Sequence, residues 1–221
     1  MNIITVKHKF SKGQKLADYV PKIAEAVKNK PDVIVGPDYG LVSYSKDRVN
    51  RKDIINADQI LSELSAKTPS TLIVPGTYAL FDQGYHAAPI FRGGKLINRF
   101  FKETNVENVA FANENGFRYK RGDSDKNKIM HNGKKITVEI CSDHGKQRVD
   151  RDTFLELILT RDLNAGFYLN AFNDNFSRYA IVNDSEIPKI EGFKYDKSSD
   201  SPLVLLEEKT LNEDLTQFNI K

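Results

Sequence analysis

The chain has 221 residues, of which 39% are hydrophobic and 29% charged, a composition typical of neither membrane nor disordered proteins. Its 33 Lys and Arg residues exceed its 30 Asp and Glu residues only slightly, and the two kinds are interspersed, so we expect no nucleic-acid partner. We see no run of 18 apolar residues and no secretion signal, so we expect no membrane association and a cytoplasmic location. The length suits one domain over residues 1–221.

The first part of the sequence alternates between strand and helix patterns. Short β-branched runs predict strands at 3–6, 32–36 and 71–74. Apolar residues at helical spacing predict helices over 16–27 and 54–64, between those strands. Strands that alternate with helices pair in parallel through right-handed crossovers. We therefore expect a parallel sheet with helices on at least one face.

From residue 85 the pattern becomes antiparallel. Segments 87–91 and 95–101 flank Arg92-Gly-Gly94, which favours a hairpin and hence a mixed sheet. Residues 102–135 are polar and predict a long loop, of a length that is more often functional than idle. A strand over 135–140 then leads into Cys141.

The last third is predicted to hold one helix and several closing strands. Asp152 is a candidate N-cap for a helix that runs to Leu163, with Phe154, Leu155 and Ile158 among its apolar residues. Further segments predict strands at 166–169, 178–182 and 203–206, and the charged tail from Glu207 is expected to be peripheral.

Three ionisable residues follow predicted strands: Asp38, Lys102 and Cys141. Ligands of open α/β sheets gather at the carboxyl ends of strands, so the three side chains could converge. A thiol becomes a nucleophile beside a cation, a carboxylate can accept its proton, and an ammonium can stabilise an oxyanion. The only cysteine cannot form an internal disulfide, and surface charges beside a buried, inert cysteine remain the alternative.

Four segments resemble motifs of the carbon–nitrogen hydrolase (nitrilase) superfamily, and they occur in that family's order. They are Val33–Leu41, with Pro-Asp at 37–38; Leu72–Thr77, which ends in Gly-Thr; Ala88–Lys102, with its Gly-Gly-Lys turn; and Ile136–Asp143, with Ile-Cys-Ser-Asp. The resemblance implies an α/β (α+β) fold, a four-layer α-β-β-α sandwich with two mixed β-sheets.

The resemblance also assigns roles to individual residues. It implies that Cys141 is the nucleophile, that Lys102 stabilises the oxyanion and that Asp38 holds the general-base position. Glu114 is the best match to a second carboxylate of the family, and the backbone near Ser142 could donate to the oxyanion.

The implied reaction is hydrolysis of a small-molecule amide or nitrile, the amide being favoured, through a thioester on the cysteine. Such a reaction needs no metal and no organic cofactor.

Two features depart from the family pattern. Asp38 stands where the family has glutamate, one methylene longer, and a shift of roughly 1 Å can cost about a hundredfold in rate. The family's helix with an Arg-Ala-x-Glu-Asn signature has no counterpart between Leu169 and Asn183, so a homodimer is left open. These departures keep a second hypothesis, a catalytically silent nitrilase-fold binding or interaction protein.

The four histidines carry one further alternative. His144 lies three residues after Cys141 and could be the base of a Cys-His pair, although a solvated loop histidine fits the same position. His8, His86 and His131 have no partner at a spacing typical of metal sites, so no metal site is predicted.

Overall fold

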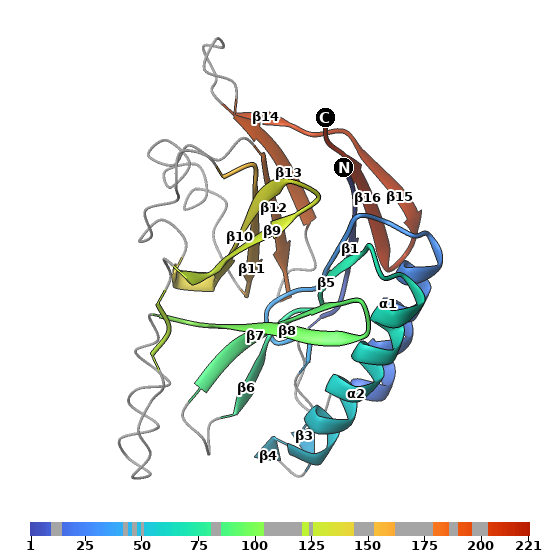
Figure 1. The fold of residues 1–221 in the computed structure, drawn as a ribbon, viewed down its shortest axis with the longest axis vertical. Helices are drawn as coiled ribbons and strands as arrows, with labels where there is room; N and C mark the ends of the chain where they lie inside the picture. Colours follow the sequence, from blue (N-terminus) through green and yellow to red (C-terminus); the bar gives the residue numbers. More distant parts are fainter. Residues whose placement is uncertain are drawn as a thin grey trace.

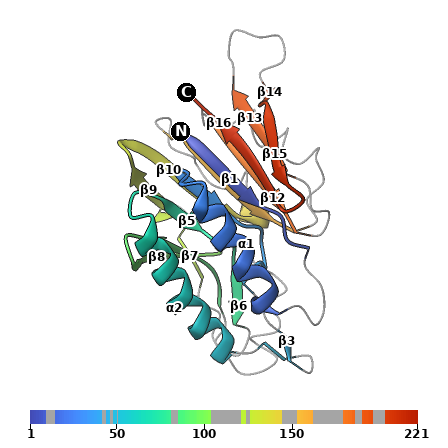
Figure 2. The same ribbon diagram turned by 90° about the vertical axis from the view of Figure 1, so that its right-hand side faces the viewer.

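A computed structural model of the chain shows two β-sheets packed face to face, with two helices on the outer face of the first sheet (Figures 1 and 2). The structure describes residues 1–9, 15–41, 44–45, 48–49, 51–80, 85–103, 121–123, 126–143, 153–161, 179–185, 190–195 and 203–221. Within these ranges no helix is both long and apolar enough to span a membrane.

The first sheet is built around three parallel strands, as predicted. They are β1 (Asn2–Val6), β2 (Val33–Val35) and β5 (Leu72–Val74), paired in the order β1-β2-β5. Helices α1 (Leu16–Lys28) and α2 (Arg51–Lys67) lie on one face of these strands (Figure 2). The strands are largely apolar because the helices cover one face and the second sheet covers the other.

The predicted hairpin extends this sheet and makes it mixed. β7 (Tyr85–Arg92) and β8 (Lys95–Phe101) are antiparallel, and β7 also pairs with β5 and with β6 (Tyr78–Leu80). Gly93 and Gly94 between them have φ values of 57° and 81°, which glycine adopts without strain and which suit a tight hairpin turn.

The second sheet has the strand order β14-β13-β12-β11-β10-β9. Its central strands β10 (Lys134–Ile140), β11 (Leu155–Thr160) and β12 (Tyr179–Asp184) are parallel, and the outer strands add antiparallel pairs. The outer strands are β9 (Lys128–His131), β13 (Ile190–Tyr195) and β14 (Leu203–Leu205). A separate two-stranded ribbon joins β3 (Tyr44–Ser45) to β4 (Arg48–Val49).

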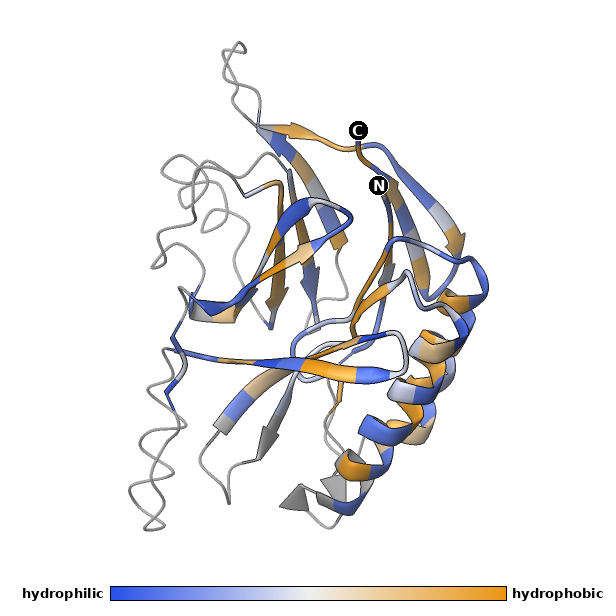
Figure 3. Cartoon of the chain, viewed as in Figure 1, coloured by the Kyte–Doolittle hydropathy of each residue, from blue (hydrophilic) through white to orange (hydrophobic). Residues whose placement is uncertain are grey.

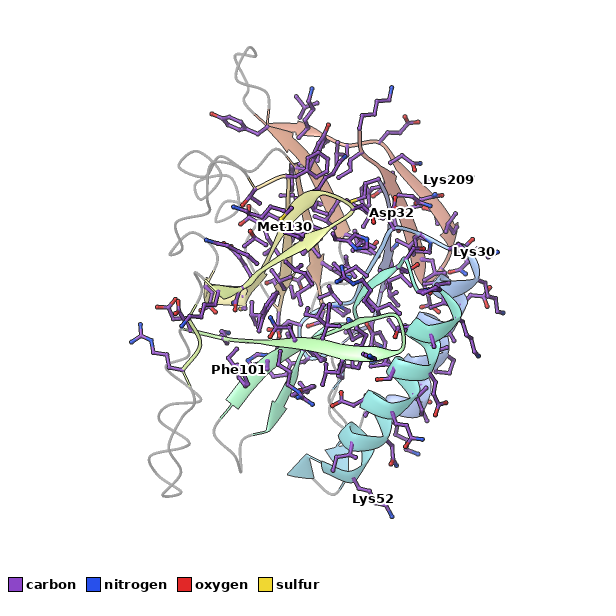
Figure 4. All side chains as sticks on the ribbon, in the orientation of Figure 1. Lys30, Asp32, Lys52, Phe101, Met130 and Lys209 are labelled. Atoms are coloured by element: carbon purple, nitrogen blue, oxygen red, sulfur yellow. The ribbon has the colours of Figure 1, made fainter. Side chains whose placement is uncertain are left out.

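One apolar core joins the two sheets. Ile3, Val33 and Val74 from the first sheet belong to the same buried cluster as Val138 and Leu157 from the second. The central strands are accordingly hydrophobic in Figure 3, and their side chains fill the space between the sheets in Figure 4. The labelled lysines, Lys30, Lys52 and Lys209, lie at the periphery (Figure 4).

The fold class is therefore confirmed as an α/β sandwich with two mixed sheets. Both helices of the described ranges lie on the first sheet. The second sheet carries only the short 3₁₀ turn Cys141–Asp143 among the described residues. Residues 166–169, which were predicted to form a strand, lie outside these ranges, as do most residues between Leu169 and Asn183.

The helix predicted from Asp152 to Leu163 is wrong. Residues 155–160 form β11, in the middle of the second sheet, where all six residues are buried. The spacing of Leu155, Ile158 and Leu159 suits a helix, but a short apolar run also suits a strand that is covered on both faces. Parallel neighbours on both sides decide in favour of the strand.

The prediction of a peripheral tail after Glu207 is also wrong. The tail forms β15 (Glu208–Asn212) and β16 (Leu215–Asn219), and β16 pairs antiparallel with β1. Leu215 and Phe218 are fully buried or nearly so on opposite faces of β16, Leu215 in the cluster under the helices and Phe218 in the cluster between the sheets. Of the charged residues in the tail, Glu208 and Lys209 lie on β15 at the edge of the sheet, and Glu213 and Asp214 lie in the turn before β16.

Candidate functional site

Each of the three predicted ionisable residues follows a strand, as expected. Asp38 lies three residues after β2, Lys102 directly after β8, and Cys141 directly after β10. The carboxylate of Asp38 and the ammonium of Lys102 interact through their charges. Asp38 is fully buried and Lys102 is 5% exposed, so solvent screens this interaction little.

The two oxygens of the Asp38 carboxylate have different surroundings. Oδ1 accepts hydrogen bonds from the Thr77 hydroxyl and from the backbone N–H of Tyr39 at 3.1 Å, and it lies 2.8 Å from Nε2 of His86. Oδ2 is buried and has no hydrogen-bond partner among the described residues. The carboxylate is therefore anchored through one oxygen, and the other keeps its lone pairs.

The loops that follow β2 and β5 hold this carboxylate in place. The backbone N–H of Tyr39 donates to the Thr77 hydroxyl at 2.8 Å, and the N–H of Thr77 donates to the carbonyl of Pro37 at 3.3 Å. At Gly76 the φ angle is 106°, and a Cβ there would lie 2.3 Å from the Pro37 carbonyl oxygen. Only glycine permits this close approach of the two loops.

The pKa of Asp38 is held below its ordinary value although burial alone would raise it. The charge of His86 and its hydrogen bond, the charge of Lys102 and the hydrogen bond from Thr77 together outweigh the loss of hydration. Asp38 is consequently ionised at neutral pH, which a general base requires.

Lys102 is positioned through its backbone. Its N–H donates to the carbonyl of His86 at 2.9 Å, and its carbonyl accepts from the N–H of Gly122 at 3.0 Å. A Cβ at Gly122 would lie 1.8 Å from the carbonyl oxygen of Phe101, so only glycine fits here. The start of the segment after β8 is thus held between β7 and residues 121–123.

Cys141 has an unusual backbone conformation. Its φ angle is 51°, in the left-handed region that residues other than glycine rarely adopt, and such strain is concentrated at functional sites. The Sγ atom is partly exposed and donates a weak hydrogen bond to the carbonyl of Arg161 at 3.8 Å. Asp143 of the same turn accepts from the N–H of Glu103 at 2.7 Å, which ties Cys141 to the segment after Lys102.

Arg161 and Tyr39 connect Cys141 with the surroundings of Asp38. The guanidinium of Arg161, whose carbonyl accepts from Cys141, lies 5.6 Å from the centre of the Tyr39 ring. Tyr39 is the neighbour of Asp38 in sequence. Asp38 and Lys102 thus interact directly through their charges, and Cys141 is connected to them only through neighbouring residues.

The remaining predicted site residues are Glu114, Ser142 and His144. Glu114 and His144 lie outside the described residues, and Ser142 follows Cys141 in the 3₁₀ turn. His86 has no partner at a metal-site spacing in the sequence, but in the structure it contacts Asp38 directly. The only sequence signal for it was its place on a hairpin strand that ends beside Lys102.

Comparison with known proteins identifies the fold. No family model and no curated protein matches the sequence. Solved structures of an amidase from Nesterenkonia sp. AN1, of the nitrilase superfamily, match all of this chain and 90% of theirs with a TM-score of 0.71 at 12% identity. Another structure of that amidase matches at a TM-score of 0.69 and 11% identity, with 93% of its chain covered.

A second protein has the same arrangement in part of its chain. Glutamine-dependent NAD⁺ synthetase from Acinetobacter baumannii matches 98% of this chain and 44% of its own, with a TM-score of 0.66 at 16% identity. The chain thus has the fold of the nitrilase superfamily, at a sequence identity that speaks for the fold alone.

Proposed function

We propose that this protein is a cysteine-dependent hydrolase of non-peptide carbon–nitrogen bonds, with an amide as the favoured substrate and a nitrile as the other. The observation that carries the proposal is the strained Cys141 at the end of β10, together with the ionised Asp38 and the buried Lys102, which interact through their charges. The similarity of fold to an amidase whose active-site cysteine adds covalently to acrylamide supports it.

The proposed reaction has two steps. Asp38 takes the thiol proton through Oδ2, and the Cys141 sulfur attacks the amide carbon while Lys102 stabilises the negative oxygen of the tetrahedral intermediate. Asp38 returns the proton to the leaving nitrogen, which departs as ammonia or an amine. Water, deprotonated by Asp38, then attacks the thioester carbon. The carbon–sulfur bond breaks, a carboxylic acid is released, and the proton passes from Asp38 to the Cys141 sulfur. The family resemblance adds Glu114 and the backbone N–H near Ser142 as supporting groups.

Release of ammonia from small amides tests the proposal. We expect the wild-type chain to release ammonia from at least one member of a panel of short aliphatic amides, and Cys141→Ala to release none. A parallel panel of nitriles distinguishes the two substrate classes. A thioester that accumulates on the wild-type protein, visible as an added acyl mass, would identify the intermediate.

The second candidate is a silent binding protein with the same fold. It is favoured by the short Asp38 side chain, whose Oδ1 is already committed to Thr77 and Tyr39. If no amide or nitrile distinguishes the wild-type protein from Cys141→Ala, and if Cys141 reacts no faster than a free cysteine, this candidate replaces the hydrolase.

A further inference from the structure

His86 is a fully buried histidine for which the proposed reaction has no role. Its Nε2 lies 2.8 Å from Oδ1 of Asp38 and 2.8 Å from the hydroxyl oxygen of Thr77. Its ring also packs against the ring of Tyr39, with 4.8 Å between the centroids. The imidazole therefore contacts the base, the hydroxyl that anchors the base and the residue after the base.

A β-bulge in β8 places Lys102 opposite His86. From the turn, Arg92 is opposite Lys95, a register that would set His86 opposite Phe101. The irregularity between Ile90 and Phe91 shifts the pairing by one residue, and the N–H of Lys102 consequently donates to the carbonyl of His86. Residues opposite each other share a face of the sheet, so His86 and Lys102 both lie on the face toward the second sheet.

The contact with Asp38 shows which nitrogen of the His86 ring carries a proton. An ionised carboxylate only accepts, so Nε2 carries a proton and donates it to Asp38. Nδ1 is buried and has no partner among the described residues. Nε2 is therefore the nitrogen through which the ring acts on Asp38.

We propose that His86 is a positioning residue that orients the short carboxylate of Asp38 so that Oδ2 remains the base. The inference rests on the proposed function for the use of Oδ2, but the contact between the two side chains stands without it. Donors from three directions, namely the His86 ring, the Thr77 hydroxyl and the Tyr39 backbone, converge on Oδ1. They fix the plane of a carboxylate that is one methylene shorter than glutamate.

The charged groups around Asp38 determine how its pKa should respond to the loss of His86. Asp38 faces the Lys102 ammonium as well as His86, and the Arg161 guanidinium lies over the Tyr39 ring. Loss of the His86 donor leaves Asp38 with less stabilisation of its ionised form while the burial remains. The pKa of Asp38 should then rise toward or above its ordinary value.

The experiment is a pH titration of the Asp38 carboxyl carbon by ¹³C NMR, with Asp38→Asn used to assign the signal. We expect His86→Leu to raise the pKa of Asp38 by about one unit. His86→Gln, whose amide can donate from nearly the same position as Nε2, should restore most of the wild-type value. Thr77→Val, which removes a different donor to the same oxygen, gives an independent second variant if His86→Leu does not fold.

A second readout follows the reaction of Cys141 with iodoacetamide over the same pH range. We expect the pH below which the labelling rate falls to be higher in His86→Leu than in the wild-type protein, and to be close to the wild-type value in His86→Gln. Equal slowing in both variants with the pKa of Asp38 unchanged would make His86 a packing residue and overturn the inference. An unchanged pKa of Asp38 in His86→Leu would overturn it as well.

The NMR titration separates this inference from the proposed function. If the wild-type protein releases no ammonia but the pKa of Asp38 responds to His86 as expected, the hydrolase fails and the positioning contact stands. If ammonia is released but the pKa does not respond, the hydrolase stands and the role of His86 is withdrawn.

Discussion

At Asp38 the two carboxylate oxygens divide two tasks that one buried group must perform. Oδ1 satisfies the need of a buried charge for hydrogen bonds, and Oδ2 keeps a lone pair for chemistry. Lys102 supplies the compensating positive charge from the end of β8. The same ammonium should stabilise a thiolate at Cys141, because the two segments are joined by the hydrogen bond between Glu103 and Asp143.

Neutralising Lys102 should therefore slow the alkylation of Cys141. Lys102→Met keeps the apolar stem but removes the charge, and we expect iodoacetamide at pH 7 to label Cys141 about tenfold more slowly, which corresponds to a thiol pKa raised by about one unit. The rate of labelling can be followed by mass spectrometry of the intact protein.

Lys126→Met is the matched control for this change. Lys126 is highly exposed and pairs with Asp123, so its loss should leave the rate unchanged. Equal rates in the wild-type protein and in Lys102→Met would contradict a role for Lys102 in activating the thiol.

At the scale of elements, the strands that carry the site were predictable, and some contacts between them were not. The apolar runs before Asp38 and Cys141 and the glycine pair of the hairpin predict the strands correctly. No feature of the sequence predicts the bulge opposite Ile90 and Phe91, because the register there depends on packing against neighbouring strands. Without it, Phe101 rather than Lys102 would lie opposite His86, so the placement of His86 and Lys102 on one face was not predicted.

β11 illustrates the opposite error. Its six residues suit a helix or a strand equally well when they are read alone, and only the parallel pairing with β10 and β12 selects the strand. β2 and β5 are also covered on both faces, but their runs are short and rich in β-branched residues, so the pattern predicted them correctly.

Substitution by alanine should destabilise the protein more at Gly122 than at Gly133. Gly122→Ala places a Cβ against the backbone oxygen of Phe101, and we expect it to lower the free energy of unfolding by about 2 kcal/mol. It should also slow the alkylation of Cys141, since the same segment holds the carbonyl of Lys102. Urea unfolding and labelling rates measure the two effects.

Gly133→Ala serves as the comparison for that substitution. Gly133 has a φ of 72° but no atom within 4 Å of an added Cβ, so only backbone strain of about 1 kcal/mol is expected. Its labelling rate should equal that of the wild-type protein. A Gly122→Ala protein as stable and as reactive as Gly133→Ala would show that the segment yields without disturbing Lys102.

At the scale of the whole molecule, buried histidines link stability to pH. Burial, with a further contribution from Lys22, lowers the pKa of His8 from its ordinary value of 6.5 to about 4. Burial also lowers the pKa of His131, which lies on the β9–β10 hairpin against the carbonyl of Asp32. Both side chains are neutral in the folded protein under conditions in which the unfolded chain would protonate them.

The folded state should consequently lose stability in acid. Below pH 6.5 the unfolded chain binds a proton at His8 that the folded chain binds only near pH 4, so stability falls between these values and is unaffected above them. We expect a loss of about 2 kcal/mol from His8, after allowance for solvent screening. Urea midpoints at pH 7.5, 6.5, 5.5 and 4.5 would record it.

His8→Phe keeps an aromatic ring against Tyr19, which lies 4.6 Å from the His8 ring, but it cannot titrate. Its stability should decline less between pH 6.5 and 4.5 than that of the wild-type protein. Parallel pH curves for the two proteins would place the acid sensitivity elsewhere. Asp38, with its lowered pKa, contributes in the same direction only below its ordinary value of 3.8.

The pairing of β16 with β1 makes the chain nearly a closed ring. The amino group of Met1 donates to the carbonyl of Ile220, and the two ends lie side by side in Figure 1. Anything joined to either end would leave the molecule from the same place, and a short linker could join the two ends without bending a strand. Joining the two ends should therefore leave the shape of the sandwich unchanged. The chain could then be opened at another exposed turn.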